Sequence, residues 1–405
     1  MAATTLFVLV ALLFVPVHAQ SQSSEEGFIS AVISQKGLDF SKDILVDLAI
    51  TSLAPLSLPQ IQKTVKIPLV GNVHIVLSNI TIYRVDVSAS EVKPGDTGIT
   101  IVASGATANL SMNWYYSYGT WFIPIVVSDK GHASIQVEGL EVGLTLGLEN
   151  QEGTLELSLM ECSCFVKEIS IDLDGGASWL YQGLVDFFEG QITSSVENAI
   201  TKNMKEGVLK LDSLFNTFPK EIPVDEIAAL NIAFVNDPML TDSSIGFEID
   251  GLFVAADKAV NHGYYHKISK SSVSCKGPPK MLEISIDEAV FNSASDIYFN
   301  VISTSASVEV IRNNLAGNVG LNDFTLTLKW SKVGNFHMHL IQSVMWIFLK
   351  TVFLPYVNLH LKKGFPLPII RGFNLQNAKI LCTNSLITVC SDVALADSFY
   401  NYLFP

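Results

Sequence analysis

Charged residues are scarce in this chain of 405 residues: they make up 16% of the sequence, whereas hydrophobic residues make up 49%. After the first twenty residues, no charge-free run reaches the roughly 18 apolar residues that a bilayer-crossing helix needs. We therefore expect no membrane-spanning segment in the mature chain. A soluble fold with this much apolar surface must bury it or use it to bind apolar ligands, which makes lipid binding the first hypothesis.

Basic residues are few as well. The chain has 25 Lys and Arg against 39 Asp and Glu, a formal net charge of −14. Because no Lys/Arg stripe offsets this charge, the surface should repel phosphate-rich partners, and we expect no nucleic-acid partner. The sequence also lacks a nucleophile elbow, a P-loop, a dinucleotide fingerprint and a metalloprotease helix. We therefore predict a protein that is not an enzyme and that has no cofactor and no metal site.

The first twenty residues have the form of a secretory signal peptide. An apolar run from Leu6 to Val15 is followed by the small-residue pattern Val17-His18-Ala19, which predicts cleavage after about residue 19. The run is preceded by no Lys or Arg, and an uncleaved membrane anchor is the alternative. Sequons at Asn79 and Asn109 fit passage through the secretory pathway. We expect a secreted, extracellular glycoprotein with these two asparagines as its glycosylation sites.

Five cysteines in an oxidising compartment favour disulfides, and their odd number leaves one unpaired in a monomer. Cys382 and Cys390 flank a turn-like stretch between apolar strands, so we predict that they bridge a hairpin. Cys162 and Cys164 are less suited to each other, because residues two apart in a strand lie about 6.6 Å from one another, near the upper limit for a disulfide.

Two kinds of periodicity follow one another along the chain. From Ile61 to Leu173 apolar and polar residues alternate over long stretches, which predicts a meander of antiparallel strands with one buried face. From about residue 177 apolar residues recur every four positions, which predicts a helix roughly 50 Å long. The residues of this ladder that we consider are Leu180, Leu184, Phe188, Ile192, Val196, Ile200 and Met204. A shorter helix before the meander presents Ile44 and Leu48.

These two helical faces have two interpretations. They pack on the sheet as ordinary core, or they line an elongated apolar groove that takes acyl chains. We take the groove as the candidate ligand site, and the core interpretation remains open.

The order of elements suggests a domain repeated in shortened form. We place the signal peptide at residues 1–19, a first lipid-binding domain at 20–255, a linker without periodicity at 256–280 and a second domain at 281–405. The second domain has its own long apolar helix, from about Met338 to Leu361, with Pro355 predicted to kink it.

Three stretches, in order, resemble the bactericidal permeability-increasing protein / lipopolysaccharide-binding protein (BPI/LBP) family: Ile33–Asp39, Ser331–Phe336 and Lys363–Pro368. The closing segment Val389–Val393 looks like the plant branch of that family. The resemblance implies an α+β fold, a boomerang of two tandem barrel-plus-long-helix domains joined by a central antiparallel sheet. Each domain would have an apolar pocket for phospholipid tails, closed by its helix ladder.

The chain departs from the family in its length. Between Asn300 and Val301 the sequence passes from what resembles the start of the second domain to what resembles its middle. We therefore expect a second domain that is truncated at this point and a second barrel that does not close.

A second departure is the hairpin at the tip of the first domain, which is strongly basic in vertebrate members of the family. Here the hairpin is aromatic and has no Lys or Arg; its rings are Trp114, Tyr115, Tyr116, Tyr118 and Trp121. Because Trp and Tyr are enriched at the membrane interface, we predict that these rings contact the membrane or bacterial surface. The alternative is an ordinary hairpin with aromatic cross-strand pairs.

The family also implies a disulfide between the region of Cys164 and the long helix. The matching helix position is Leu209, so that bond cannot form. Cys162, Cys164 and Cys275 are then expected to be free or paired differently.

The residues and the resemblance together predict a secreted, monomeric, non-enzymatic protein that binds lipopolysaccharide in innate immunity. It would hold acyl chains in its grooves and contact membranes or bacteria peripherally. A phospholipid or lipid-transfer carrier of the same fold is the alternative. A secreted lipid hydrolase is a third possibility, but it would need a nucleophile beside a base, and none is visible.

Overall fold

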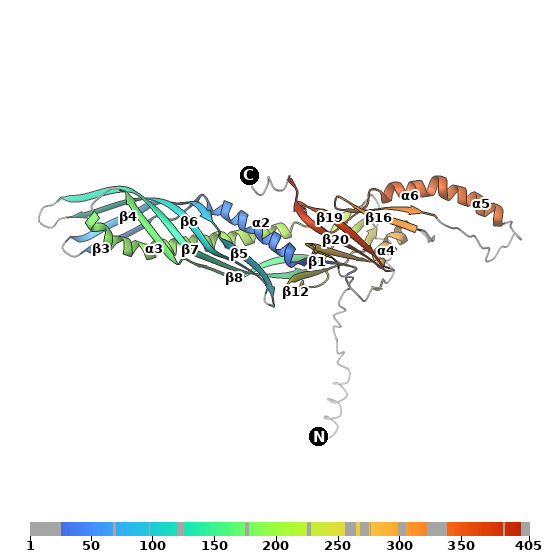
Figure 1. The fold of residues 1–405 in the computed structure, drawn as a ribbon, viewed down its shortest axis with the longest axis horizontal. Helices are drawn as coiled ribbons and strands as arrows, with labels where there is room; N and C mark the ends of the chain where they lie inside the picture. The colour runs from blue at the N-terminus through green and yellow to red at the C-terminus, as the bar shows by residue number, and fades with distance from the viewer. Residues whose placement is uncertain are drawn as a thin grey trace, which may run out of the picture.

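The chain is elongated in a computed structural model, with the two ends of the long axis formed by different parts of the sequence (Figure 1). The structure describes residues 26–67, 70–96, 98–119, 125–174, 178–224, 228–255, 265–267, 275, 277–298, 305–321, 338–383 and 385–397. For residues 178–187, 255, 294–298, 305, 338–341 and 345 it describes the backbone only. The predicted signal peptide and Trp121 lie outside the described residues.

The first domain is built on an eight-stranded antiparallel sheet, as the alternating pattern predicted. Its strands follow the order β2-β4-β6-β7-β8, while β3 pairs with β4, β5 with β6 and β9 with β7. The strands are β2 (Leu56–Ser57), β3 (Ile61–Ile67), β4 (Gly71–Asp86), β5 (Ala89–Gly95), β6 (Gly98–Gly119), β7 (Val126–Gln151), β8 (Thr154–Phe165) and β9 (Glu168–Asp174). Every second residue of β6 from Ala106 to Tyr116 is buried, because successive strand residues point to opposite faces.

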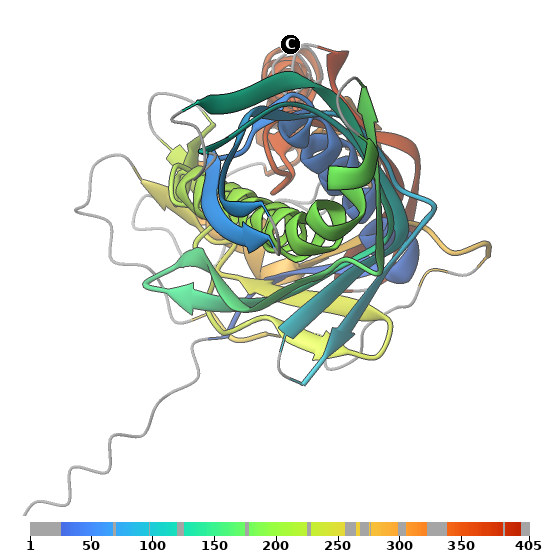
Figure 2. The same cartoon turned by 90° about the vertical axis from the view of Figure 1, so that its left-hand side faces the viewer.

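The sheet curls around two helices, α2 (Gln35–Leu53) and α3 (Ser178–Phe215), which lie inside its ring when the molecule is viewed along its long axis (Figure 2). Ser34 caps α2 by accepting a hydrogen bond from the Gly37 amide at 3.4 Å. The 38 residues of α3 confirm the predicted long helix. Its apolar side chains from Phe188 to Met204 pack in the barrel core, and those from Val208 to Phe215 pack in a second core at the centre of the molecule.

A six-stranded sheet joins the two halves of the chain, in the order β12-β13-β1-β15-β20-β19. Its strands are β1 (Ile29–Ser34), β12 (Met239–Thr241), β13 (Ser244–Ile249), β15 (Leu282–Asp287), β19 (Phe373–Cys382) and β20 (Leu386–Leu395). Ile29, Ile284 and Val389 are fully buried in it. The expectation of a central antiparallel sheet is therefore confirmed. Beside it lies a three-stranded sheet of β10 (Glu221–Pro223), β11 (Ala228–Asn231) and β14 (Phe253–Ala255).

The described part of the second domain is much smaller than the first. It has the three-stranded sheet β16 (Ser305–Ile311), β17 (Asn314–Gly320) and β18 (Phe365–Pro366), with helix α4 (Glu288–Tyr298) before it. A continuous helical segment then runs through α5 (Met338–Phe348), a π-helical turn η1 (Leu349–Phe353) and α6 (Leu354–Leu361). The described residues form an open sheet beside this helix.

The π-helical turn lies directly before Pro355. A proline inside a helix cannot donate to the carbonyl four residues back, and its ring collides with that carbonyl. Here the Leu354 amide bonds to the Leu349 carbonyl, a five-residue step, and the helix continues. By length and composition, the segment Gln342–Leu361 is long and apolar enough to cross a membrane. The expectation from sequence considered charge-free runs alone, and it therefore passed over this segment, which Lys350 interrupts.

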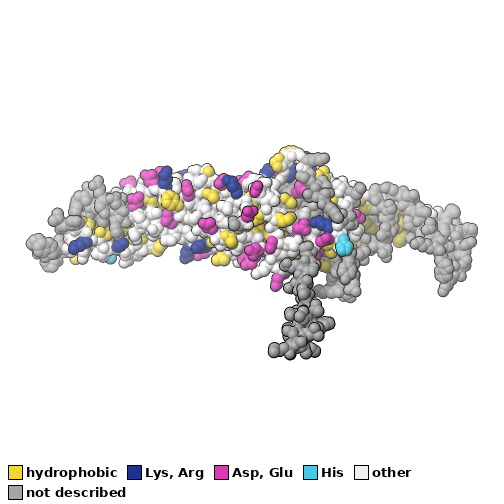
Figure 3. All heavy atoms as spheres, turned by 90° about the horizontal axis from the view of Figure 1, so that it is seen from below, with side chains coloured by type: hydrophobic (Ala, Val, Ile, Leu, Met, Phe, Trp, Pro, Cys, Tyr) yellow, Lys and Arg dark blue, Asp and Glu magenta, His cyan; other side chains and the backbone are white. Residues whose placement is uncertain are grey.

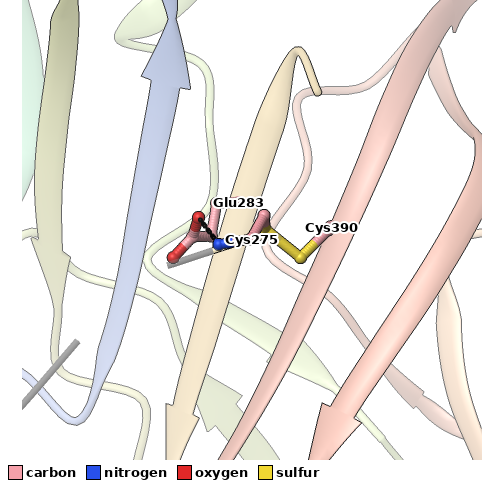
Figure 4. Close-up of side chains that lie close together, drawn as sticks. All are labelled: Cys275, Glu283 and Cys390. Carbon is pink, nitrogen blue, oxygen red and sulfur yellow. Dashed lines mark hydrogen bonds between the residues drawn. A yellow bond between two sulfur atoms is a disulfide. The ribbon is translucent and has the colours of Figure 1, made fainter. Parts of the chain in front are cut away.

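The predicted disulfide between Cys382 and Cys390 is also wrong: Cys390 bonds to Cys275, and Cys382 is free (Figure 4). In the hairpin register Cys390 lies opposite Lys379 and Cys382 opposite Ile387. The three-residue offset separates the two cysteines by roughly 10 Å along the strands, too far for a bond. The observed disulfide ties the segment before β15, within the predicted linker, to the central sheet.

Candidate functional site

The apolar ladder of α3 lies in the interior of the first barrel. Phe188 is 5% exposed, and Ile192, Val196 and Ile200 are fully buried among strand residues such as Leu110. For Leu180 and Leu184 only the helical backbone is described. The core interpretation thus accounts for the middle of the ladder, and a ligand contact there remains a prediction.

At the edge between α2 and α3 a side-chain hydrogen bond joins the two helices, and each helix has apolar side chains that are only partly covered. Ile44 and Leu48 are half-buried, and neither belongs to the two cores of the described residues. Met204 on α3 is half-buried and packs against the barrel core. Ser52 of α2 donates to the Asn203 side chain of α3 at 2.8 Å, which holds the helices together at this edge. In the first domain, we take this edge as the candidate place where an acyl chain could cover apolar surface without displacing core residues.

Lys42 fixes the position of α2, and sequence reasoning missed it. Its side chain is buried, yet the ammonium group has three partners: the Ser90 carbonyl at 3.2 Å, the Ser90 hydroxyl at 3.0 Å and Asp43 at 2.7 Å. A buried charge is tolerated only when it is paired and hydrogen-bonded. Lys42 therefore anchors α2 to β5 two residues before Ile44. In the sequence, this role could have been suspected because Lys42 lies two positions before the apolar residue Ile44.

Two carboxylates of α3 fix that helix to β8, an outer strand of the barrel. Asp212 accepts a hydrogen bond from the Leu157 amide at 2.9 Å, and Glu197 accepts one from the Val166 amide, just beyond β8, at 3.0 Å. Unpaired amides on an outer strand need partners, and here helix side chains supply them. The α3 face is thus held at fixed depth in the barrel.

A cleft of about 420 Å³ lies where α2 begins, against β5. Its walls include the charged side chains of Asp39, Glu91, Lys93 and Asp242. Gln35 crosses it to donate to the Val92 carbonyl at 3.0 Å. Polar, mostly acidic walls do not suit an acyl chain, so this cleft is not the predicted groove.

The aromatic hairpin does not present its tryptophan to the surface. Trp114 and Tyr116 are 5% and 7% exposed, and their rings stack at 5.9 Å inside the barrel. The Trp114 Nε1 donates to the His132 carbonyl at 3.0 Å, and Gly131 leaves room for the indole, since a Cβ there would lie 2.5 Å from it. The predicted membrane contact is therefore wrong for Trp114 and Tyr116, because even-numbered positions of β6 face inward.

The remaining described rings of the hairpin, Tyr115 and Tyr118, differ in their exposure. Tyr115 is 38% exposed on the outer face, and Tyr118 is half-buried against the barrel core, stacked on Tyr116. A surface role for Tyr115 stays a prediction. The inner rings, Trp114 and Tyr116, fit the alternative interpretation, an ordinary hairpin with packed aromatic side chains.

The free thiols of the barrel are poor nucleophiles. Burial raises the pKa of Cys162, and it raises that of Cys164 to about 12, with the Glu197 carboxylate adding to the effect. Both thiols are therefore protonated at neutral pH. Leu209, where the family disulfide would need a partner, is exposed on α3.

Cys275, Glu283 and Cys390 place a carboxylate and two sulfurs within 4.8 Å of one another (Figure 4). The sulfurs are bonded to each other, so they offer no thiolate to a metal. Glu283 accepts a hydrogen bond from the Cys275 amide at 3.2 Å, while burial raises the pKa of its carboxyl group. We therefore interpret these three residues as a structural link between the segment before β15 and the central sheet.

Comparison with known proteins adds to this geometry. Residues 37–211 match the LBP / BPI / CETP family, N-terminal domain, and residues 300–395 match the C-terminal domain of the same family. A BPI/LBP family protein of Arabidopsis thaliana is 46% identical over 95% of both chains. The bactericidal permeability-increasing protein of Sebastes schlegelii is 23% identical, over 89% of this chain and 94% of its own.

Among solved structures, the crystal structure of lipopolysaccharide binding protein matches with a TM-score of 0.71 at 17% identity. The match covers 91% of this chain and 99% of that one, so the two share a fold. The Arabidopsis alignment has 468 positions against the 405 residues here, so at least 63 of its positions face gaps in this chain.

Proposed function

The chain belongs to the LBP / BPI / CETP family, and we propose that it is a secreted, non-enzymatic protein that binds lipopolysaccharide through its acyl chains. The acyl chains lie along the edge between α2 and α3, against Ile44, Leu48 and Met204. The observation that carries this proposal is the pair of half-buried apolar side chains on α2 that join neither core. A ligand that covers such half-buried apolar side chains gains free energy by excluding water from them.

The binding energy in this proposal comes from hydrocarbon. Each methylene that leaves water contributes about 0.8 kcal/mol, so several acyl chains suffice without a cationic clamp. On the first strand of the hairpin, residues 107–119 have no Lys or Arg, and on the second strand the exposed Lys130 lies opposite Tyr115. One exposed lysine contributes little to holding lipid phosphates. We therefore expect lipopolysaccharide binding to change little with salt.

A phospholipid carrier is the second candidate, favoured by the scarcity of cations on the described hairpin, because it needs no phosphate recognition. The two functions separate in a competition experiment. A fluorescent fatty-acid probe is bound to the protein and displaced by lipopolysaccharide or by phosphatidylcholine, at low and high salt. If the protein binds lipopolysaccharide, lipopolysaccharide should displace the probe at lower concentration than phosphatidylcholine does, at both salt levels. If phosphatidylcholine displaces the probe at equal or lower concentration, the carrier function is assigned instead.

The site itself is tested with Ile44→Asp/Leu48→Asp, which places two carboxylates where the acyl chain should lie. The matched control is Leu209→Asp, an apolar-to-acid change at an exposed position of α3. We expect the double variant to lose most probe binding and the control to keep it. Full probe binding by a folded double variant would rule out this edge.

The absence of catalysis belongs to the same proposal. Protonated Cys162 and Cys164 support it, and incubation with ester lipids should yield no free fatty acid above a protein-free blank. Turnover that survives further purification would contradict it.

Secretion and glycosylation complete the proposal. Asn79 is exposed at an irregularity of β4, whereas Asn109 is half-buried in β6 between Arg84 and Gln136. We expect a glycan at Asn79, removable by peptide N-glycosidase. An unchanged mass after treatment of the secreted protein would exclude it.

The proposed domain plan keeps the boundaries predicted from sequence, with the second domain shortened between residues 300 and 301. The greater length of the Arabidopsis alignment supports a shortened chain, and the open three-stranded sheet supports the second domain as the shortened part.

A further inference from the structure

The second-domain helix exposes an apolar stripe that no described residue covers. Val344, Phe348, Val352, Tyr356 and Leu359 are between 48% and 67% exposed. Single exposed apolar side chains are normal on protein surfaces, but five at helical spacing over four turns form a continuous face.

The spacing keeps this stripe on one side of the helix. In an ordinary α-helix, steps of four residues drift around the axis by about 40° each. The π-helical turn Leu349–Phe353 holds more residues per turn and so opposes this drift between Phe348 and Val352. The irregularity before Pro355 therefore straightens the apolar stripe.

The other side of the helix is fixed to the protein. Asn358 donates to the Val319 carbonyl at 3.0 Å and accepts from the Val319 amide at 2.7 Å. This paired contact fastens α6 to β17. Because Asn358 is two residues from Tyr356, the two side chains point in different directions, and the fastening leaves the apolar stripe free.

Charge around this helix is opposite in sign to the rest of the chain. Residues 324–391 have seven Lys and Arg and no Asp or Glu, although the whole chain carries −14. Figure 3 shows Asp and Glu side chains spread over the first domain and the centre of the molecule. The described cations of this segment are exposed, and none forms an ion pair with a described residue; they are Lys350, Lys362, Lys363, Arg371 and Lys379.

The position of Lys350 limits how this helix can contact a membrane. It lies near the middle of Gln342–Leu361, where a spanning helix would place its charge at the bilayer centre at high cost. It is two residues from both Phe348 and Val352, so it points away from the stripe, and its ammonium group lies 4.5 Å from the Trp346 ring centroid. A helix with apolar residues on one side and Lys on another suits the plane of a membrane surface.

We propose that the segment Gln342–Leu361 lies flat on an anionic phospholipid bilayer, with the apolar stripe among the acyl chains and the flanking cations on the headgroups. Charge selects this occupant over a second copy of the chain, since two copies meeting through this segment would bring like charges together. The inference goes beyond the acyl-chain edge of the first domain and holds whether or not that edge takes lipid.

The experiment is co-sedimentation of the full chain with vesicles of phosphatidylcholine alone or mixed in equal parts with phosphatidylglycerol. Phe348→Ser/Val352→Ser removes the centre of the stripe, and Met160→Ser/Phe165→Ser is its control at exposed positions of β8. Lys362→Gln/Lys363→Gln removes headgroup contacts, with Lys205→Gln/Lys210→Gln on α3 as control.

We expect the parent to bind the mixed vesicles, to bind phosphatidylcholine weakly and to lose affinity as salt rises. Each test variant should bind the mixed vesicles at least about tenfold more weakly, and each control should match the parent. Ile44→Asp/Leu48→Asp should also match the parent, which separates this surface from the lipid-binding edge.

Equal binding by parent and test variants would overturn the proposal. So would a concentration-dependent dimer in the absence of lipid that Phe348→Ser/Val352→Ser abolishes, because the stripe would then be covered by a second copy.

Discussion

Lys36 and Asp392 are separated by 356 residues, yet the Lys36 Nζ lies 2.9 Å from the Asp392 Oδ1. The same carboxylate accepts from Lys280 Nζ at 2.7 Å. One side chain on the last strand of the central sheet thus holds the first turn of α2 and the segment leading into β15. The position of α2, and with it the candidate edge, depends on the C-terminal part of the chain.

Asp392→Asn should destabilise the protein in a pH-dependent way. The two lysines lower the pKa of the Asp392 carboxyl group below its ordinary value of 3.8. Its contribution to stability is therefore present above that pH and is lost as pH falls through the lowered folded-state pKa. We expect a loss of about 1–2 kcal/mol near neutral pH, because one lysine is only 15% exposed.

The check is urea unfolding of parent and variant from neutral pH downward. The difference between them should shrink below about pH 4. Asp47→Asn, at an exposed position of the same helix α2, should stay within about 0.5 kcal/mol of the parent at every pH. A pH-independent difference for Asp392→Asn would refute the electrostatic explanation.

The Cys275–Cys390 disulfide should appear as one linked pair of tryptic peptides. Residues 380–405 contain no Lys or Arg, so Cys382 and Cys390 fall in one peptide and Cys275 in another, Ser271–Lys276. Non-reducing mass spectrometry should find the two peptides joined, with fragmentation placing the bond at Cys390. An internal Cys382–Cys390 bond would contradict the structure.

Loss of this disulfide should be costly. It closes a loop with a sequence separation of 115, for which chain entropy gives up to about 4–5 kcal/mol. We expect Cys275→Ser/Cys390→Ser to lower the free energy of unfolding by several kcal/mol in urea titrations. Cys382→Ser, at an exposed free cysteine, should change it by less than about 0.5 kcal/mol.

Gly131→Ala should destabilise the barrel by about 1–3 kcal/mol, because the methyl group would collide with the buried Trp114 ring. Gly207→Ala provides the contrast, since a Cβ there meets nothing within 4 Å and alanine favours the helix by about 1 kcal/mol. Thermal unfolding followed by circular dichroism measures both. Equal effects of the two substitutions would mean that Trp114 does not pack over Gly131.

Alkylation tests the thiols. Because the pKa of Cys164 is raised to about 12, iodoacetamide should modify it far more slowly at pH 8 than exposed Cys382 in the folded protein. Peptide mass spectrometry over time gives both rates. Comparable rates would show that Cys164 is not buried as described.

Periodicity predicted the elements of this fold well, because hydrophobic alternation and helical ladders are local patterns. The meander, the 38-residue α3 and the central sheet all followed from it or from the family resemblance. What the pattern could not give was strand register. The side on which Trp114 lies and the partner of Cys390 depend on which residues face one another across strands, and that is settled by packing of distant segments.

The candidate site was predictable only in part. The ladder on α3 identified a buried face but could not distinguish core from groove, since both require apolar residues every three or four positions. Ile44 and Leu48 differ from Ile200 only in what covers them, which is a property of the assembled fold. The exposed stripe of the second helix was likewise invisible, because its apolar sequence alone predicts burial.

Mass spectrometry of lipids that co-purify with the secreted protein is the most direct test of the central claim that this chain holds acyl chains between α2 and α3. The parent and Leu209→Asp should carry acyl lipids in near-stoichiometric amounts after mild extraction, and Ile44→Asp/Leu48→Asp should carry little. Parent protein that stays free of lipid when it is secreted and incubated with lipopolysaccharide or phospholipid would contradict the account. So would a folded double variant that carries as much lipid as the parent.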